Sequence, residues 1–362
     1  MKKINYDELV KFHCDVLRKV GLDEHSMQSV TSGLCETSLR GVDSHGARLL
    51  PHYVRSAISG RKNPTPNYKF TQTFPAVGHL NADNAFGHAA GMKAIDHCIE
   101  MSSSLGIGAV GVSNSSHPGS MASFVLKAAR QGFIAFAFTH ADALQRSHGG
   151  KRAYFGTNPV CFAAPREEDE PFCLDMATSM ISWNKLLTHR ISGDKLAENL
   201  AADAEGQITT DPNAAKSLIP AGAYKGYGLA AMVDILCGVF TGMAFGKHIP
   251  DMYTTPLEQS RYLGQFYLVM RVDGCVDSDI FISRMQQMTN EIRQEPAQED
   301  EQVMLAGDPQ IREARIRLKE GIPLDESSVK GFEELGKEGS CWEGKDIPIV
   351  CGSISALVRV HQ

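Results

Sequence analysis

Helical and strand-like segments alternate in the second quarter of the chain, and this alternation limits the possible folds more than any other feature. A helical pattern over 85–105 leads into the apolar run 107–112, and a helical stretch over 120–131 leads into the run 133–138. Short apolar runs that are bounded by turn residues and separated by helical patterns are typical of buried strands in a layered sheet. Three later apolar runs are further strand candidates: 160–164, 172–174 and 265–272. The sequence therefore predicts an α/β fold.

The chain up to Gly60 is helical instead. Apolar residues recur at helical spacing over 5–20, and a second helix is expected after Asp23, whose side chain can cap its first turn. A third, shorter helix begins near Pro51, and the proline-containing segment 61–67 then indicates a linker. We expect an N-terminal helical cap (1–67), an α/β domain that contains the functional site (68–300), and a helical C-terminal segment that packs back (301–362). The end of this segment, 341–362, is an unassigned tail.

The charge balance argues against two classes of partner. The 362 residues include 36 Lys and Arg against 42 Asp and Glu, which gives a net charge of −6. No excess of positive charge is therefore available for a nucleic-acid backbone or an anionic membrane surface. The most apolar stretch, 228–246, contains Asp234 and four glycines, so it predicts a buried helix followed by a turn rather than a membrane span. We expect no nucleic-acid partner and no membrane-spanning segment.

The cysteines and the N-terminus predict a cytoplasmic protein. Nine cysteines are scattered along the chain without a CxxC pair, so we expect reduced thiols rather than a disulfide framework or a zinc site. Residues 1–7 are polar and lead directly into a helical pattern, without the basic and apolar regions of a secretory signal.

One glycine pattern matches a dinucleotide fingerprint only in its letters. Residues 106–111 read GIGAVG, but they follow a predicted helix and begin a predicted strand. A phosphate-binding loop needs the opposite order, in which a strand precedes the glycines and the start of a helix presents its N–H groups to the pyrophosphate. The sequence therefore predicts no ordinary Rossmann domain.

A first polar cluster, DSHG at 43–46, lies between two predicted helices. His45 could exchange a proton with a substrate near neutral pH, and the Ser44 hydroxyl could orient its ring. The alternative is a simple surface turn. Arg48 follows closely and is either a contact for a carboxylate or a solvated cation.

A second polar cluster, NSSHPGS at 114–120, ends a predicted strand and precedes a predicted helix. Ligands of open α/β sheets bind at such places. Ser120 and the helix start could bind a phosphate or ribose beside His117, or the segment could be a plain helix cap. Three more junctions are weak individually, because turn, capping or packing roles also explain them: 156–159, 174–179 and 225–228.

Taken together and in this order, the clusters resemble the type 2 malate/L-lactate dehydrogenase family. The motifs that show the resemblance are DSHG at 43–46, SSHPG at 115–119, GTNP at 156–159, LDMATS at 174–179, TTDP at 209–212 and KGYGL at 225–229. The ordered set extends over most of the chain and is far more specific than any one motif.

The resemblance implies an oxidoreductase that uses NAD or NADP, a non-Rossmann mixed-sheet cofactor domain, and a homodimer with its site near the subunit interface. Hydride would move between the nicotinamide and a small 2-hydroxy or 2-oxo acid of the malate, lactate, ureidoglycolate or sulfolactate type.

The resemblance also implies roles for individual residues. His45 would be the general acid/base with Ser44 as its partner, and His117 would be a second proton-transfer group or a contact for the cofactor ribose. Thr157 and Arg48 would contact the substrate. The residues expected along the cofactor are Ser120, Asp175, Met176, Ala177, Tyr224, Lys225, Gly307 and Asp308.

The chain departs from the common family pattern in three places. Many members have an arginine four residues after the catalytic histidine, where this chain has Leu49 and offers Arg48 instead. Many also have Thr-Asn-Ser after the central strand, where this chain has Thr-His-Ala, so His140 is expected to contact the substrate and alter its choice. The segment 341–362 does not resemble the family tail.

Two alternatives remain at this point. The same hydride geometry permits the reduction of a cyclic imine acid. A metal-dependent hydrolase is the alternative from another class. The candidate ligands would be His45, His117, His140, His148 and Asp175. They show no HExxH or other ligand spacing, so we expect no metal.

Overall fold

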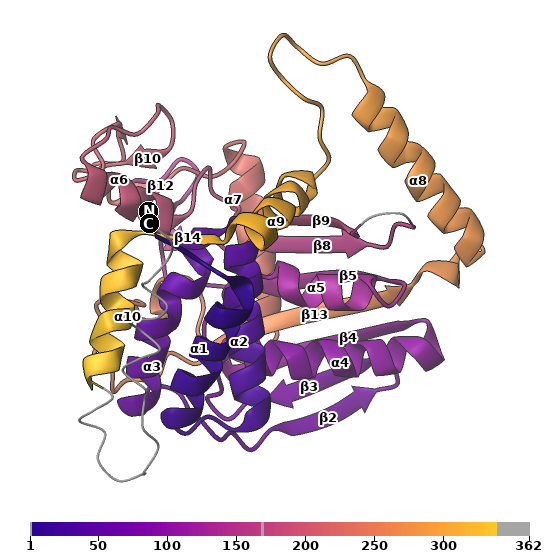
Figure 1. Ribbon diagram of the computed structural model, residues 1–362, viewed down its shortest axis with the longest axis horizontal. Helices are drawn as coiled ribbons and strands as arrows, with labels where there is room; N and C mark the ends of the chain where they lie inside the picture. Colours follow the sequence, from indigo (N-terminus) through magenta and orange to yellow (C-terminus); the bar gives the residue numbers. More distant parts are fainter. Residues whose placement is uncertain (1, 168–169, 339–362) are drawn as a thin grey trace. The chain divides into compact units, whose positions relative to one another are not determined.

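The computed structural model describes residues 2–167 and 170–338, and the tail at 341–362 lies outside the described residues (Figure 1). The chain divides into two compact units. The first contains Met1–Pro66, Leu257–Ser260 and the chain from Asp308 onward, and the second contains Asn67–Pro256 and Arg261–Gly307. The three-part division that the sequence suggests stays a prediction.

A mixed sheet of seven strands forms the centre of the second unit. Its strands, in sheet order, are β2 (Lys69–Phe74), β3 (Val77–Asn81), β4 (Ile107–Ser115), β13 (Leu263–Arg271), β5 (Phe133–Thr139), β8 (Val160–Ala164) and β9 (Phe172–Met176). Only the pairing of β3 with β4 is parallel, and all other neighbours are antiparallel. The predicted strands are therefore confirmed, and they form a mixed sheet without the parallel order of a Rossmann domain.

Two helices, α4 (Gly87–Leu105) and α5 (Ala122–Ala129), cover one face of this sheet (Figure 1). Alternate residues of β13 point toward them, so that Tyr267 and Val269 are fully buried, as expected for a strand with one face in the core. Small side chains such as Ala135 in β5 allow the helices to pack closely. The core of the unit lies between these helices and the sheet.

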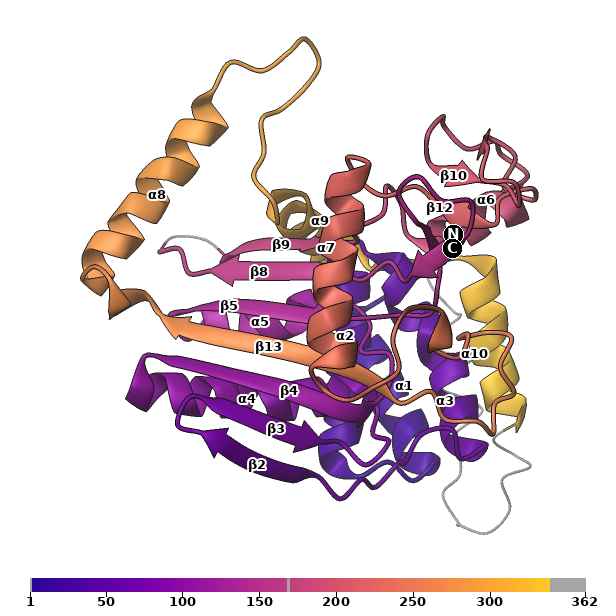
Figure 2. The same cartoon turned by 180° about the vertical axis from the view of Figure 1, so that it is seen from behind.

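The opposite face of the sheet carries α7 (Tyr224–Asp234), which continues as a π turn over Ile235–Val239 (Figure 2). The expected helix and the turn after it are present within 228–246, but the helix is buried on one side only in the described part of the chain. One side packs on the sheet through the fully buried Val233 and Cys237, but Ile235 and Phe240 on the other side are 56% and 60% exposed. Apolar composition predicted a helix here, but it could not show that only half of its circumference has a partner.

The second unit also has a small five-stranded sheet that the sequence did not predict, because its strands have only two or three residues. In sheet order these are β11 (Ile208–Thr209), β10 (Ala201–Ala202), β12 (Ser217–Leu218), β6 (Gln145–Arg146) and β7 (Ala153–Phe155). Helix α6 (Trp183–Ser192) shares a small apolar core with these strands. The unit ends with α8 (Ser278–Gln294), which projects away from the large sheet in both views (Figures 1 and 2).

The first unit is helical. Its elements are α1 (Tyr6–Lys19), α2 (Glu24–Leu39), α3 (Leu50–Ile58), α9 (Asp308–Glu320), α10 (Glu326–Glu338) and a pair of short strands, β1 (Lys2–Ile4) and β14 (Ile322–Leu324). The three N-terminal helices are confirmed, and the Asp23 side chain caps α2 by accepting a bond from the Ser26 N–H at 2.7 Å. Two 3₁₀ turns, Asp43–His45 and Ala47–Leu49, connect α2 to α3.

None of the helices in the described part of the chain combines the length and the apolar character that crossing a bilayer requires. The seven cysteines within the described ranges are free thiols. Cys341 and Cys351 lie outside the described residues.

Candidate active site

His45 and Ser44 lie in the 3₁₀ turn that follows α2 in the first unit. The Ser44 hydroxyl is 2.9 Å from Nδ1 of His45. The surrounding protein desolvates the imidazole, and the positive charge of Arg48 adds to this effect, so that the pKa of His45 falls to about 4. The ring is therefore neutral at pH 7, which is the form that can accept a proton.

Arg48 lies one turn further on, in the 3₁₀ turn Ala47–Leu49, and is half-buried. Leu49, where many relatives have arginine, is only 5% exposed and belongs to the core of the unit. The cation at this place in the first unit is therefore Arg48. Asp308, an expected cofactor contact, begins α9 in the same unit.

His117 lies beyond the end of β4 in the second unit, in a segment that is tied to the start of α4. The Ser116 hydroxyl accepts the Gly87 N–H at 3.0 Å and donates to the Ala85 carbonyl at 2.9 Å. The Nδ1 atom of His117 accepts the Gly119 N–H at 3.3 Å. This bond places the ring proton on Nε2, because a nitrogen that accepts a bond cannot also hold the proton.

Gln265 supports the same segment from β13, and the sequence analysis missed it. Its buried amide nitrogen lies within 3.2 Å of the carbonyls of Ser116 and Gly87 and 3.0 Å from the Ser115 hydroxyl. Its oxygen accepts the hydroxyl of Tyr267 at 2.7 Å. A glutamine inside an otherwise apolar strand was the available signal, because buried polar side chains require partners.

Ser120 and Asp175 meet at the start of α5. The Asp175 carboxylate accepts the Ser120 hydroxyl at 2.8 Å and the Ala122 N–H at 2.9 Å. The start of α5, expected to bind a phosphate or ribose, thus already holds a carboxylate from β9. Desolvation raises the pKa of Asp175, while the bonds from Ser120 and Ala122 act in the opposite direction.

The other expected cofactor and substrate contacts of this unit lie near the end of β9. Thr157 accepts two hydrogen bonds from Thr178 through its carbonyl, both at 2.9 Å. A side-chain carbon at Gly226 in α7 would lie 2.5 Å from the Thr178 carbonyl, so the start of α7 packs directly against this segment. The motifs that include Thr157, Thr178 and Gly226 therefore come together. Met176 and Ala177 are half-buried here, and Tyr224 and Lys225 are exposed at the start of α7.

Gly307 closes the second unit with a left-handed backbone, at φ +95°. A side-chain carbon there would lie 3.2 Å from backbone atoms of Cys173 in β9. The expected cofactor contact at Gly307 thus packs on the same strand that contains Asp175.

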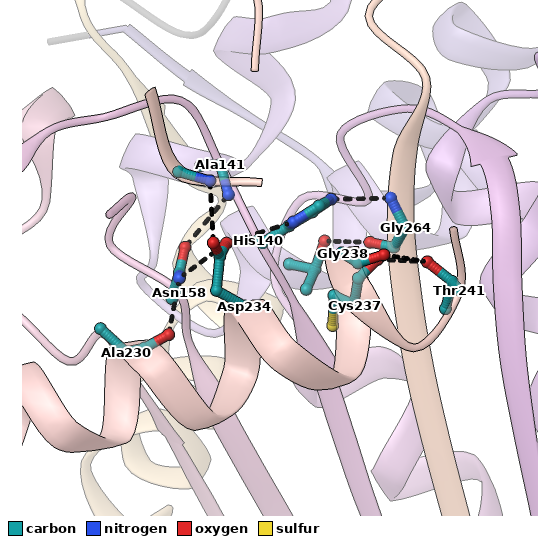
Figure 3. A network of polar contacts seen from close by, with 11 residues as sticks. His140, Ala141, Asn158, Ala230, Asp234, Cys237, Gly238, Thr241 and Gly264 are labelled. Atoms are coloured by element: carbon teal, nitrogen blue, oxygen red, sulfur yellow. Dashed lines mark hydrogen bonds and ion pairs between the residues drawn. The ribbon is translucent and has the colours of Figure 1, made fainter. Parts of the chain in front are cut away.

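His140 lies in a buried polar network rather than at a surface open to substrate (Figure 3). Its Nε2 atom accepts the Gly264 N–H at 2.8 Å, so Nδ1 holds the proton and faces Asp234 at 3.3 Å. Direct contact with a substrate was expected, but both ring nitrogens are already bonded inside the protein.

Asp234 joins this network to two neighbouring segments. Its second carboxylate oxygen accepts the Gly246 N–H at 2.8 Å. Asn158, whose backbone is left-handed at φ +32°, donates from its amide to the Ala230 carbonyl at 2.9 Å and accepts the Ala141 N–H at 3.2 Å. The network thereby fixes the GTNP segment on α7 (Figure 3). Asp234 within an apolar helix was its only sequence signal.

The GIGAVG segment has no phosphate-loop geometry. Gly106 adopts φ +83° and ends α4, and Ile107 begins β4. Across residues 2–167 and 170–338, no group of three His, Cys, Asp or Glu side chains is placed to hold a metal ion.

Known proteins share the sequence and the fold of this chain. Residues 4–333 match the family model described as malate/L-lactate dehydrogenase. The chain is 35% identical over 323 residues to the ureidoglycolate dehydrogenase (NAD(+)) of Escherichia coli K12, covering 89% of this chain and 92% of that protein. It is 33% identical over 346 residues to a malate dehydrogenase of Pyrococcus abyssi, covering 92% and 94%.

The fold agrees with a solved relative as well. The crystal structure of malate dehydrogenase from Entamoeba histolytica superposes with a TM-score of 0.89 at 25% identity, covering 96% of this chain and 99% of that chain. The expected family and the mixed α/β fold are therefore both confirmed. The chain belongs to the malate/L-lactate dehydrogenase family.

Proposed function

We propose that the protein is an NAD(P)-dependent oxidoreductase that moves a hydride between the nicotinamide and a small 2-hydroxy or 2-oxo acid. The observation that supports this most directly is the Ser44–His45 pair, whose lowered pKa keeps the imidazole neutral, with Arg48 one turn away. A neutral imidazole is a base for a hydroxyl proton, and a guanidinium is a bidentate partner for a carboxylate. The names of the relatives point to the same reaction class.

The donors and acceptors of the second unit fit a dinucleotide. Asp175 is an exposed residue, and its carboxylate can accept ribose hydroxyls. The start of α7 presents the Lys225 cation and the Tyr224 ring, which is 63% exposed. A cation at the start of a helix suits a phosphate. When bound, the nicotinamide supplies the hydride acceptor or donor.

His45 would move the proton. With Nδ1–H donated to the Ser44 hydroxyl, the Nε2 lone pair takes the hydroxyl proton of the 2-hydroxy acid and returns it in the reverse direction. Ser44 holds the ring in this tautomer. In the first unit, Arg48 would bind the carboxylate of the substrate. In the second unit, Thr157 stays the expected substrate contact. His117 stays a second proton-transfer group or a ribose contact through its Nε2–H.

The first test is absorbance at the reduced-nicotinamide band with NADH or NADPH and a panel of oxaloacetate, pyruvate, oxalurate and sulfopyruvate. Oxidation of the cofactor with one of these acids supports the proposal. Turnover of cyclic imine acids alone would replace it by the imine-reductase alternative. If neither cofactor binds in a fluorescence titration, the proposal is wrong.

A variant pair tests the role of His45. His45→Gln is expected to lower kcat by roughly 10²- to 10⁴-fold, the usual contribution of a general acid or base, with unchanged affinity for the cofactor. His79→Gln, a half-buried histidine in β3, is the matched control and should retain wild-type kcat. Full turnover by a folded His45→Gln protein would remove His45 from the mechanism.

The proposal includes a homodimer in the cytoplasm. Apolar side chains on the outer side of α7 and the π turn support the dimer, because Ile235, Val239 and Phe240 are 56% to 60% exposed and contiguous apolar patches mark interfaces. Ile280 and Met288 add exposed apolar surface along the projecting α8.

Light scattering coupled to size-exclusion chromatography tests the dimer. The double change Ile235→Glu and Val239→Glu should give a monomer, while Ile191→Glu on α6, which is 78% exposed, should leave the mass unchanged. A wild-type monomer at micromolar concentration would refute this part of the proposal. Fractionation of producing cells tests the cytoplasmic location.

A further inference from the structure

Arg317 in α9 grips the turn that contains Ser44 and His45. Its Nη1 and Nη2 atoms donate to the two carboxylate oxygens of Asp43, at 2.6 and 3.0 Å. Asp43 is the first residue of the 3₁₀ turn Asp43–His45. A parallel pair of bonds of this kind fixes the orientation of the carboxylate as well as its distance, which a single cation such as lysine does not do.

The same guanidinium also reaches the helix before the turn. Nη1 donates to the Ser38 carbonyl at 2.7 Å, near the end of α2. The Nε atom donates to Glu313, one turn earlier in α9, at 2.6 Å. Arg317 is only 8% exposed. One buried side chain therefore connects α9, the end of α2 and the catalytic turn.

Ser38 also contacts the chain that follows the turn. Its hydroxyl accepts the Ala47 N–H at 2.8 Å, and a side-chain carbon at Gly46 would lie 2.1 Å from the same oxygen. Only glycine fits at position 46 while the backbone keeps this path. His45 thus lies between two anchored residues. Arg317 binds Asp43 directly, and Ser38, which Arg317 also binds, holds Ala47.

The turn has little stability of its own. It spans three residues, and no side chain caps its start. Short 3₁₀ segments have poor hydrogen-bond geometry and depend on their surroundings. The contacts of Asp43 and Ala47 therefore help to set the position of the His45 ring.

We propose that Arg317 is a positioning residue that holds the Ser44–His45 pair in its reactive orientation through Asp43 and Ser38. This proposal rests on the proposed proton-transfer role of His45. Arg317 acts through the turn and binds no substrate. A displacement of about 1 Å at a reacting group can lower a rate by roughly 10²-fold. The loss of the Arg317 contacts with Asp43 and Ser38 should therefore lower kcat.

The test compares Arg317→Ala and Arg317→Lys with Glu320→Gln. Glu320 lies on the same helix and pairs with Lys3 at 2.7 Å, away from the turn, so its variant is the matched control. Arg317→Ala is expected to lower kcat by roughly 10- to 100-fold with unchanged cofactor affinity. Arg317→Lys should recover little of this loss, and Glu320→Gln should retain wild-type kcat.

Chemical rescue separates positioning from general stability. Millimolar guanidinium can enter the space left in Arg317→Ala and bind Asp43, so it should raise kcat severalfold in this variant and not in the wild type. A folded Arg317→Ala protein with wild-type kcat would overturn the proposal. If this variant does not fold, Asp43→Asn replaces it, because it removes the charge from an exposed residue of the turn; wild-type kcat in Asp43→Asn would equally overturn it.

A readout without substrate keeps this proposal separate from the proposed function. The imidazole resonances of His45 and its rate of carbethoxylation report the environment of the ring directly. Both should change in Arg317→Ala and remain as in the wild type in Glu320→Gln. If His45→Gln is fully active, the proton-transfer role fails, and these readouts still decide whether Arg317 positions the ring. Unchanged readouts in Arg317→Ala would refute the positioning role.

Discussion

The hydroxyl of Ser120 donates to the carboxylate of Asp175 at 2.8 Å, and this bond joins the start of α5 to β9. The same carboxylate accepts the Ala122 N–H, so it occupies the place where a phosphate would bind at the start of a helix. A carboxylate there favours ligands that donate hydrogen bonds, such as the hydroxyls of a ribose. The negative charge of Asp175 would repel a phosphate on that ribose, such as the 2′-phosphate of NADPH.

Removal of the carboxylate should therefore weaken cofactor binding. Charged hydrogen bonds contribute about 1.5–3 kcal/mol each, so Asp175→Ala is expected to raise the Kd for NADH by roughly 10- to 100-fold. Asp175→Asn should weaken NADH binding more than NADPH binding, because it removes an acceptor and also the repulsion of a 2′-phosphate. Fluorescence titration with both cofactors measures these changes.

Ser120→Ala is the variant for comparison, since it removes one of the two hydrogen bonds to the carboxylate and keeps the carboxylate charge. Its effect on Kd should be smaller than that of Asp175→Ala. Equal NADH affinity in the wild type and in Asp175→Ala would show that Asp175 does not contact the ribose.

The charge of Arg48 should be visible in the titration of His45. Desolvation lowers the pKa of His45 to about 4, and the positive charge of Arg48 contributes to the shift. Arg48→Gln removes that charge, so the midpoint of the His45 imidazole resonance should move upward. Arg55→Gln, which removes a cation from α3 that pairs with Glu334, should leave the midpoint unchanged.

The same pKa fixes the sign of the pH dependence of catalysis. Oxidation needs the neutral imidazole, so kcat/KM for the hydroxy acid should be insensitive to the His45 titration above pH 5 and fall as the pH drops through about 4. Reduction needs the protonated ring, so its rate should decline as the pH rises above that value. A break near pH 6.5 that disappears in His45→Gln would contradict the lowered pKa.

The sequence predicted the large elements of both units because each has a long, consistent pattern. The helix after Asp23 and the strands of the seven-stranded sheet all have apolar periodicity of the right length. The short strands of the second sheet have only two or three residues, such as Ala201–Ala202, so no periodicity could reveal them. Their position depends on contacts between segments that are far apart in the chain.

The candidate site was predictable as a set of motifs but not as a geometry. The order of the motifs and their residue types indicated Ser44, His45 and Asp175 as site residues. Nothing local indicates that Arg317 in a charged C-terminal helix binds Asp43, because a surface arginine has the same local pattern. His140 was assigned to the substrate for a related reason, since a one-residue departure from the family pattern does not show which way the ring points.

The buried His140–Asp234 pair should be important for stability. In His140→Leu, the Gly264 N–H loses its partner, and the Asp234 oxygen that faced the ring keeps only the longer bond from the Asn158 amide at 3.4 Å. A buried polar group without a partner costs about 1–3 kcal/mol, so we expect the free energy of unfolding to fall by at least this amount in urea titrations. His79→Leu removes a half-buried histidine that bonds Ser113 at 2.9 Å, and it should cost less than about 1 kcal/mol, within the usual net value of one hydrogen bond. Equal losses in the two variants would show that the His140 network contributes no more than a single half-buried hydrogen bond.

His13 should make the protein sensitive to mild acid. The ring is fully buried in α1, between Phe12 and Phe332, and its Nδ1–H donates to the Leu9 carbonyl at 2.9 Å. Burial lowers its pKa from 6.5 to about 4, and the bond to Leu9 only partly opposes this. Between these two values the unfolded chain binds a proton that the folded chain does not.

The stability that depends on His13 should therefore be fully retained above about pH 6.5 and fall as the pH drops toward 4, by about 3 kcal/mol for a shift of this size. His45, whose pKa is lowered to the same value, adds to the fall over the same pH range. His13→Leu removes this proton uptake, so its unfolding free energy, measured in urea between pH 4.5 and 7.5, should depend less steeply on pH. Phe332→Leu changes the same aromatic contact without removing a titratable group, and it should lower stability equally at every pH. An unchanged slope in His13→Leu would show that the acid sensitivity comes from other groups, such as His45.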